Sequence, residues 1–322
     1  MLYPPRIRRE SGVCVQMRAG LPVIGYGRSF AAPYGEAMAL SRRVTRVLAP
    51  NPGPFTFRGT GVYLIGAGDS VAVIDSGPLL EAHVAALLRA IGGRRVSHIL
   101  ITHTHRDHSP GVAAIKAATG AEVLAEGPHR PARPVHVGDA PLLDASNDTA
   151  FRPDRTLADG EVVQGDGWTL EAVATPGHTA NHMAFAFKAA DVLFSGDHVM
   201  AWSTPVVAPP DGSMGDYMAS LQKLAARSEP VYLPGHGGAV RNAPRFVAAY
   251  ILHRKAREAS ILNRLRNGES DIPSLVSAIY ANLDPKLVRA AGMSVLAHLE
   301  DLVARGAVRT NGPASIKGLY RL

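Results

Sequence analysis

The sequence predicts an α/β fold that is followed by a small C-terminal unit of helices and a hairpin. Short apolar runs with strand character alternate with amphipathic helical segments between residues 51 and 240. Several of these runs lead directly into a loop that carries histidine or aspartate, and beyond Pro244 helical periodicity dominates. With 322 residues, of which 46% are apolar, the chain is long enough for about two domains and a substantial core.

The first 240 residues divide into extended and helical segments. A turn at Gly66-Ala67-Gly68-Asp69 predicts a hairpin of strands over 62–65 and 71–74, and a further strand-rich stretch covers 161–187. Helices are expected near 35–48 and, from the helical spacing of apolar residues, over 79–91, 112–118 and 214–226. This alternation is typical of α/β folds.

The C-terminal segment has a different pattern. Residues 246–265 carry a long amphipathic repeat that predicts a helix, and shorter helical segments centre on Val276, Leu287 and Leu296. The turn Asn311-Gly312 between two short extended stretches predicts a hairpin. Three helices followed by a hairpin predict a winged helix.

The most specific motif is His103-Thr104-His105-Arg106-Asp107-His108, which follows the apolar run 98–102. Imidazole nitrogens and carboxylate oxygens are ligands that zinc selects, and two histidines at i and i+2 leaving a strand point to one side of it. His103 and His105 can therefore hold one ion, while Asp107 and His108 in the following turn reach a second. A core or surface role is the usual explanation of a lone histidine, but three within six residues favour a metal site.

Three later segments repeat the arrangement of a short apolar run, a glycine-containing turn and a candidate donor. His178 and His236 each follow a Pro-Gly pair, and Asp197 follows Ser195-Gly196. An ordinary loop explains each turn as well when it is taken singly. Their joint order makes these residues the expected partners of the first motif.

This order of donors resembles that of the metallo-β-lactamase superfamily from Asn51 to Pro244, and the donor set resembles its glyoxalase II and ribonuclease branches. The resemblance implies an αβ/βα four-layer sandwich with a dinuclear site, for which Zn2+ is the expected metal and Mn2+ or iron are alternatives. It implies that His103, His105 and His178 hold one cation, that Asp107, His108 and His236 hold the other, and that Asp197 bridges them.

The C-terminal unit extends the resemblance to the lactamase-β-2-like branch, whose studied members include single-strand RNA endonucleases. Residues 51–60, 175–182 and 253–254 match that branch. The implied organisation is an N-terminal extension packing on the catalytic domain (1–50), a metallo-β-lactamase-like catalytic domain (51–250) and a winged-helix domain (251–322).

The implied chemistry is hydrolysis by a hydroxide that bridges the two cations, with Asp107 and Asp197 as the catalytic carboxylates. Substrate contacts are expected near the donors, with plain packing as an equal alternative for each of them. The expected contacts are His182, Trp202 and Tyr217, with Asn181, His198 and Asp216 as further candidates.

Three functions stay open, because the donors alone do not select the substrate. The first is a phosphodiesterase acting on single-stranded RNA, which the winged helix and the basic flanks favour. The second is a hydrolase of small-molecule esters, thioesters (as in glyoxalase II) or lactones, which the acidic catalytic region favours. A catalytically dead nucleic-acid-binding protein is the third, although an inactive scaffold has no chemical reason to keep seven donors.

Charge is distributed unevenly along the chain. Lys and Arg outnumber Asp and Glu by 8 to 2 in residues 1–50 and by 13 to 6 in 239–322, whereas residues 51–238 hold 13 against 19. Basic flanks can attract a polyanion, and ordinary solvated surface charge is the alternative. The expected phosphate contacts are Arg264, Arg266, Lys286, Arg289, Arg309 and Lys317.

The single cysteine, Cys14, excludes an intramolecular disulfide and lies far from every motif, so the cysteine-ligated chemistry of the commonest class B β-lactamases is not expected. No apolar stretch approaches the roughly 18 residues that span a bilayer, and residues 1–9 lack the apolar core of a secretory signal. A cytoplasmic protein without a membrane partner is expected, with monomer and homodimer both open.

Overall fold

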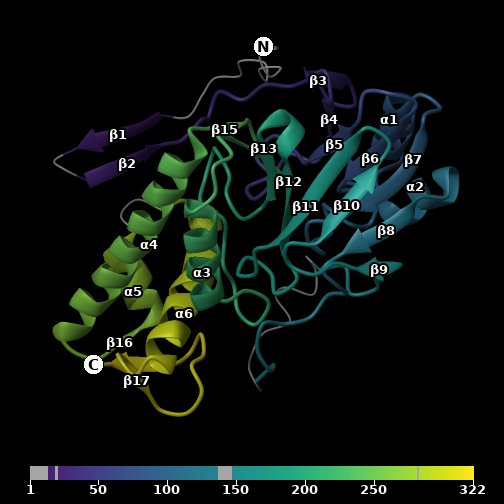
Figure 1. Ribbon diagram of the computed structural model, residues 1–322. Helices are drawn as coiled ribbons and strands as arrows, with labels where there is room; N and C mark the ends of the chain where they lie inside the picture. Colours follow the sequence, from purple (N-terminus) through teal and green to yellow (C-terminus); the bar gives the residue numbers. More distant parts are fainter. Residues whose placement is uncertain (1–13, 19–20, 137–146, 281–282) are drawn as a thin grey trace.

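The computed structural model describes residues 14–18, 21–136, 147–280 and 283–322 (Figure 1). Two β-sheets lie face to face with helices on both outer sides, and a smaller helical unit with a three-stranded sheet lies at one end. The predicted four-layer sandwich and the C-terminal winged helix are both confirmed.

One sheet has seven strands in the order β3-β4-β5-β6-β7-β8-β9. Its β5 and β6 form the predicted antiparallel hairpin, and β6 to β9 run parallel, so that the loops after β6 and β7 meet at one edge. The strands are β3 (Ala37–Ser41), β4 (Val44–Leu48), β5 (Gly61–Ile65), β6 (Ser70–Ile74), β7 (Arg95–Leu100), β8 (Glu122–Ala125) and β9 (Arg155–Thr156).

The other sheet has six strands in the order β10-β11-β12-β13-β14-β15. It is antiparallel except where β13 pairs with β14 in parallel, which makes Gly196 and Pro234 neighbours at the ends of these strands. The strands are β10 (Val162–Gly165), β11 (Trp168–Ala174), β12 (Met183–Phe187), β13 (Val192–Gly196), β14 (Val231–Pro234) and β15 (Val240–Arg241), with a 3-10 turn, η1 (Lys188–Ala190), before β13.

Residues 35–48 do not form the expected helix. They form the antiparallel pair β3 and β4, and β4 pairs along its whole length with β5. The alanine, methionine and leucine residues here favour a helix in isolation, but sheet pairing buries Leu40, Val44 and Val47 in the cores. Tertiary pairing therefore outweighs local propensity.

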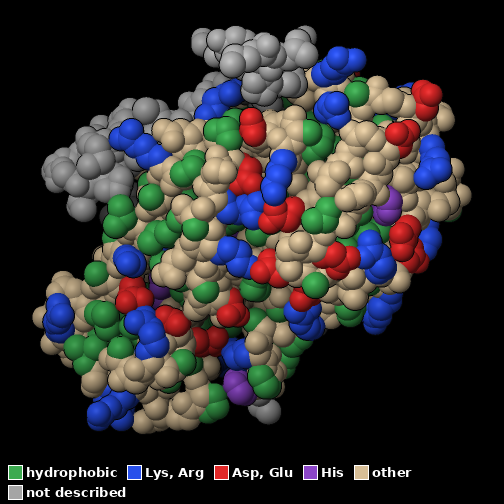
Figure 2. Space-filling model, viewed as in Figure 1, with side chains coloured by type: hydrophobic (Ala, Val, Ile, Leu, Met, Phe, Trp, Pro, Cys, Tyr) green, Lys and Arg blue, Asp and Glu red, His purple; other side chains and the backbone are tan. Residues whose placement is uncertain are grey.

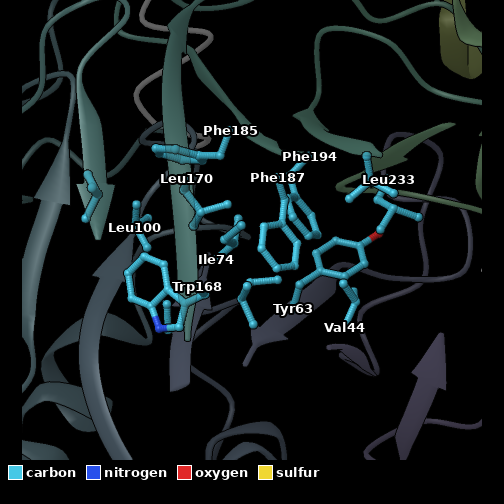
Figure 3. Packing of buried hydrophobic residues seen from close by; sticks show 14 of the residues in the cluster. Val44, Tyr63, Ile74, Leu100, Trp168, Leu170, Phe185, Phe187, Phe194 and Leu233 are labelled. Carbon is cyan, nitrogen blue, oxygen red and sulfur yellow. The ribbon is translucent and has the colours of Figure 1, made fainter. Parts of the chain in front are cut away.

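Apolar side chains from both sheets fill the space between them (Figure 3). All residues of β5, β6, β12 and β13 are buried, as expected for strands covered on both faces. Tyr63 of β5 meets Phe194 of β13 with ring centroids 5.1 Å apart, and its hydroxyl donates to the carbonyl oxygen of Pro234 at 2.7 Å. Tyr63 therefore ties the end of β14 to the opposite sheet.

Helices cover the outer face of each sheet. Two predicted helices pack on the seven-stranded sheet and both end at a glycine in the left-handed conformation, Gly92 at φ 65° and Gly120 at φ 71°. Two more pack on the six-stranded sheet. The first pair is α1 (Glu81–Ile91) and α2 (Val112–Thr119), and the second is α3 (Met214–Ala225) and α4 (Ala243–Arg266).

Helix α4 enters two cores. Its Phe246 and Tyr250 lie in the sandwich, whereas Ile261 and Leu265 lie in the core of the winged helix. The predicted domain boundary at residue 250 falls inside this helix. The other elements of the winged helix are α5 (Ile272–Ile279), η2 (Pro285–Leu287), α6 (Val288–Ala304) and the sheet β16-β18-β17, formed by Ser270–Asp271, Leu319–Arg321 and Arg309–Thr310.

Part of the predicted N-terminal extension forms a hairpin of β1 (Cys14–Arg18) and β2 (Leu21–Gly25) beside α4 (Figure 1). Residues 1–13 and 19–20 lie outside the described residues. Among the helices that the structure describes, none combines the length and apolar character needed to cross a membrane.

Candidate metal centre

The loop after β7 and the loop after β11 place three imidazoles around one point. His103 Nε2 lies 3.0 Å from His105 Nδ1, and His178 Nε2 lies 3.1 Å from the same atom. Zinc–nitrogen bonds of about 2.0–2.1 Å in a tetrahedral arrangement would separate ligand atoms by about 3.3 Å. The three nitrogens therefore have the mutual spacing that one bound cation requires.

A second group adjoins the first. His236 Nε2 lies 3.1 Å from Asp107 Oδ2 and 3.4 Å from His108 Nε2. Asp197 lies between the groups, with Oδ2 at 3.2 Å from His236 Nε2 and 3.8 Å from His178 Nε2. The structure thus brings all seven predicted donors together.

Asp197 provides a test of whether these residues fit a metal. The residue is only 6% exposed, and its Oδ1 has no hydrogen-bond partner among the described residues. A buried carboxylate oxygen without a donor is costly unless a positive charge faces it. Because imidazole and carboxylate donors suit zinc, manganese and iron, the residues present fit a divalent cation of this kind.

Burial keeps two imidazoles of the first group, those of His103 and His178, neutral. Desolvation, together with the neighbouring imidazoles, holds the pKa of His103 well below its usual value. Desolvation and the nearby His105 lower the pKa of His178 to about 4. These rings therefore keep free lone pairs at neutral pH, as a metal ligand must.

In the second donor group, attraction between the histidines and the aspartates sets the pKa values. Burial alone would lower the pKa of His236, but Asp197 and Asp107 raise it to about 10. Burial likewise opposes ionisation of Asp197, yet His236 and His108 hold the pKa of Asp197 well below its usual value. The carboxylates stay ionised, and the site between them favours positive charge.

Comparison with known proteins identifies the fold family. Residues 56–236 match the family model described as the metallo-beta-lactamase superfamily, and residues 272–315 match the beta-lactamase associated winged helix domain. The chain belongs to the metallo-beta-lactamase superfamily. A metallo-beta-lactamase family protein from Thermus thermophilus has the same fold at a TM-score of 0.71 and 25% identity, covering 88% of this chain and 99% of that one.

Two named relatives are similar to this superfamily protein over most of its length. It is 34% identical to the beta-lactamase-like protein 2 homolog of Caenorhabditis elegans over 79% of this chain and 82% of that protein. It is 32% identical to the atrochrysone carboxyl ACP thioesterase AgnL7 of Paecilomyces divaricatus over 76% of this chain and 72% of that protein.

Asp75, at the end of β6, supports both donor groups and was not anticipated from the sequence. Its Oδ2 accepts hydrogen bonds from His108 Nδ1 at 2.8 Å and from Thr102 Oγ1 at 3.0 Å, and its Oδ1 accepts from Thr102 N at 2.8 Å. The Thr102 hydroxyl also lies 3.0 Å from His103 Nδ1. A carboxylate of this kind fixes the tautomer and orientation of a metal-ligating imidazole. The aspartate directly after the apolar run 71–74 was the only signal available.

Backbone carbonyls and a hydroxyl hold further donors of the superfamily site. His178 Nδ1 lies 2.7 Å from the carbonyl oxygen of Val206, and His236 Nδ1 lies 3.1 Å from that of Gly59. Thr60 Oγ1 donates to Asp107 Oδ2 at 3.1 Å. Each of these histidines therefore presents Nε2 to the other donors.

Glycine is required where the donors crowd the backbone. A Cβ at Gly235 would lie 2.6 Å from Asp197 Oδ1 and 2.6 Å from His108 Cε1. Gly196 has φ 48°, and a Cβ there would lie 2.6 Å from His182 Nε2. The Gly-Asp and Gly-His pairs of the sequence are thus steric requirements of the cluster.

The three expected substrate contacts occupy different positions. His182 is fully buried behind Asp197, with Nε2 accepting from the Asp197 backbone N–H at 3.1 Å and Nδ1 lying 2.8 Å from Thr175 Oγ1. Tyr217 is also fully buried. These two residues support their neighbours rather than lie open to a substrate. Trp202, by contrast, is partly exposed.

The further candidates also differ in their surroundings. Asn181 bonds to Thr104 and to loop carbonyls, His198 is buried against the Tyr217 ring, and Asp216 is exposed in the first turn of α3. Asp211, which was not anticipated either, is a buried carboxylate whose Oδ2 lies 3.4 Å from His105 Nε2. It occupies the outer side of that ring, where it can orient the donor nitrogen.

Proposed function

We propose that this superfamily hydrolase is a metal-dependent thioesterase that holds two divalent cations, with zinc as the expected metal. The observation that carries the metal-dependent part of the proposal is the convergence of the donors on Asp197, whose buried Oδ1 lacks a hydrogen-bond partner among the described residues. His103, His105 and His178 would hold one cation, Asp107, His108 and His236 the other, and Asp197 would contact both.

When bound, the cations would supply positive charge that polarises a thioester carbonyl and lowers the pKa of the attacking water. Asp107 is 23% exposed at its side chain and is held by Thr60, so it can accept a hydrogen bond from that water and orient it. Asp197 is more deeply buried, and its negative charge would hold the cations in place. Asp75 and the carbonyls of Val206 and Gly59 keep the imidazoles aimed at the cluster.

The thioester is favoured over other bonds by the relative from Paecilomyces divaricatus, whose name specifies a thioesterase. Side-chain charge also favours it over RNA on the face that Figure 2 shows, where blue and red groups intermingle instead of forming a continuous basic strip. In the winged helix, Arg305 is paired with Glu258 and Asp301. That arginine is therefore already neutralised.

Cleavage of single-stranded RNA is the second candidate. The winged-helix match and the excess of basic residues in 239–322 favour it. The arginines and lysines expected to contact phosphate would then position a strand near the metal centre. A cytoplasmic location and a homodimer remain predictions for either function.

A substrate panel separates these functions. Zinc-loaded protein is assayed with S-lactoylglutathione, S-acetyl-N-acetylcysteamine, a lactone and a labelled single-stranded RNA, each with and without chelator, while elemental analysis counts the metal. Chelator-sensitive thioester hydrolysis that Asp107→Asn abolishes and Asp69→Asn leaves intact is the expected result. Asp69 is the matched control, because it lies exposed in the β5–β6 turn. RNA cleavage with steep salt dependence and no thioester turnover would contradict the proposal and support the second candidate.

A further inference from the structure

Two aromatic rings on separate loops lie beside the candidate metal centre, close to the backbone around His236. Phe57 and Trp202 stack with ring centroids 4.9 Å apart and an interplanar angle of 9°. Trp202 packs on Gly237, the residue after His236, where a Cβ would lie 3.0 Å from Trp202 Cδ1. Phe57 lies two residues before Gly59, whose carbonyl oxygen is 3.1 Å from His236 Nδ1. Both rings are therefore attached to backbone that adjoins the same donor, His236.

The loop that carries Phe57 is fixed in place. Phe57 has φ 55°, a left-handed conformation that phenylalanine rarely adopts. Its N–H donates to the carbonyl oxygen of Gly53 at 2.8 Å. Asn51 holds the far end by accepting from the N–H of Thr60 at 2.9 Å. Strained residues of this kind persist where the surroundings enforce them, commonly at functional sites.

Helix α4 fixes the loop that carries Trp202. The hydroxyl of Tyr250 lies 2.6 Å from the carbonyl oxygens of both Met200 and Ser203, which flank the tryptophan. Arg254 Nη2 donates to the carbonyl oxygen of Pro205 at 2.6 Å. The two rings are thus held in a preorganised pair before any ligand arrives.

Core packing does not account for this pair. Neither ring belongs to the apolar core clusters of the described residues, and both side chains are partly exposed. The indole N–H of Trp202 is buried and has no hydrogen-bond partner among those residues. A partly exposed aromatic surface of this kind is suited to a planar ligand.

We propose that the Phe57–Trp202 pair binds the acyl group of the substrate and selects planar, aromatic acyl groups over short alkyl ones. This inference rests on the proposed thioesterase function. A thioester carbonyl that reaches the metal centre carries its acyl group close to His236, where the pair lies. Stacking on the rings then adds binding that an acetyl group cannot obtain.

Ligand binding tests the pair without relying on turnover. Isothermal titration of the zinc-loaded protein compares 2-naphthoate with cyclohexanecarboxylate, which has the same carboxylate but no planar ring system. Phe57→Leu keeps an apolar side chain and removes the stack, and Phe55→Leu is the matched control, since Phe55 is 53% exposed on the same loop. Phe57→Leu should weaken 2-naphthoate binding by about threefold to tenfold and change cyclohexanecarboxylate binding by less than about twofold. Phe55→Leu should change neither.

Two results in Phe57→Leu would overturn the inference. An equal loss for both carboxylates would show that the ring acts only through the loop. No loss for either would show that the ring does not contribute to binding. Kinetics give a second measurement: kcat/KM for S-(2-naphthoyl)-N-acetylcysteamine should fall in Phe57→Leu while that for the S-acetyl analogue stays unchanged. If the selective loss of 2-naphthoate binding is found but no thioester is hydrolysed, the aromatic surface stands and the thioesterase function fails. If thioesters are hydrolysed without the selective loss, the aromatic surface alone fails. RNA cleavage that depends on Phe57 would assign the pair to nucleobases and overturn the acyl assignment.

Discussion

Replacement of Asp75 by asparagine is the sharpest test of how the donors are held. Asparagine has nearly the same shape and keeps one oxygen that can accept from Thr102 N, as Asp75 Oδ1 does at 2.8 Å. Its NH2 group would then face His108 Nδ1, which now lies 2.8 Å from Asp75 Oδ2. A donor there requires Nδ1 of His108 to accept, which places the ring proton on Nε2, the atom that faces His236 and Asp107.

The expected loss follows from this change of tautomer. A protonated Nε2 cannot ligate a cation, and loss of a supporting carboxylate typically weakens metal binding by about 10- to 100-fold, or about 1.4 to 2.7 kcal/mol. Zinc affinity is measured by competition with a chelator in wild type, Asp75→Asn and the exposed control Asp69→Asn, with circular dichroism as the check on folding. Wild-type zinc affinity in folded Asp75→Asn would refute the proposed support.

Three further predictions concern the metal and the winged helix. Asp197→Asn should lower bound zinc and reduce thioester hydrolysis by at least about 100-fold, since the carboxylate between the two donor groups is lost; full turnover in that variant would contradict its role. Chelation should lower the midpoint of thermal unfolding, and zinc at about 100 times its Kd should restore about 2.7 kcal/mol, so an unchanged midpoint would argue against metal binding. Burial and the nearby Arg254 lower the pKa of His298 in α6 from the usual 6.5 to about 3. The unfolded chain therefore binds a proton that the folded chain does not, and the free energy of unfolding falls as the pH drops from 6.5 toward 3. At pH 5 this loss is about 2 kcal/mol, and His298→Leu should flatten the dependence of unfolding free energy on pH between 7 and 5 by that amount; an unchanged slope would show that the ring is not buried and neutral.

Elements with a strong period or a defined turn were predictable from the sequence. The helical spacing around Leu87 and Ile115 and the turn at 66–69 each predicted the element that the structure contains. The helix predicted for residues 35–48 was wrong. Their alanine, leucine and methionine content favours a helix, but β4 gains its stability from pairing with β5, more than ten residues away. The two-residue strand β16 is too short to leave a periodic signal, whereas β17 was predictable from the Asn311-Gly312 turn that follows it.

The residues of the candidate site also divide into those that the sequence could predict and those that it could not. The seven donors could be found because each follows an apolar run and because they include a dense histidine motif. Asp75 and Asp211 could not be singled out, since one acidic residue in a loop carries no spacing and their partners lie 33 and 106 residues away in the chain. The position of His182 shortly after a donor in the sequence predicts a substrate contact, but the turn at 175–182 directs it behind Asp197. Proximity along the chain does not reveal which side of a cluster a residue occupies.

Helix α4 runs through both the sandwich and the winged helix, so its length limits which substrates can contact both parts. From Tyr250, which holds the loop of Trp202, to Leu265 in the winged helix, the helix rises about 22 Å at 1.5 Å per residue. A free small-molecule ester is too short to touch both ends of that span, whereas an acyl chain tethered to a carrier or a strand of several nucleotides can bridge it. Simultaneous recognition by the sandwich and the winged helix therefore requires a substrate that extends well beyond the scissile bond.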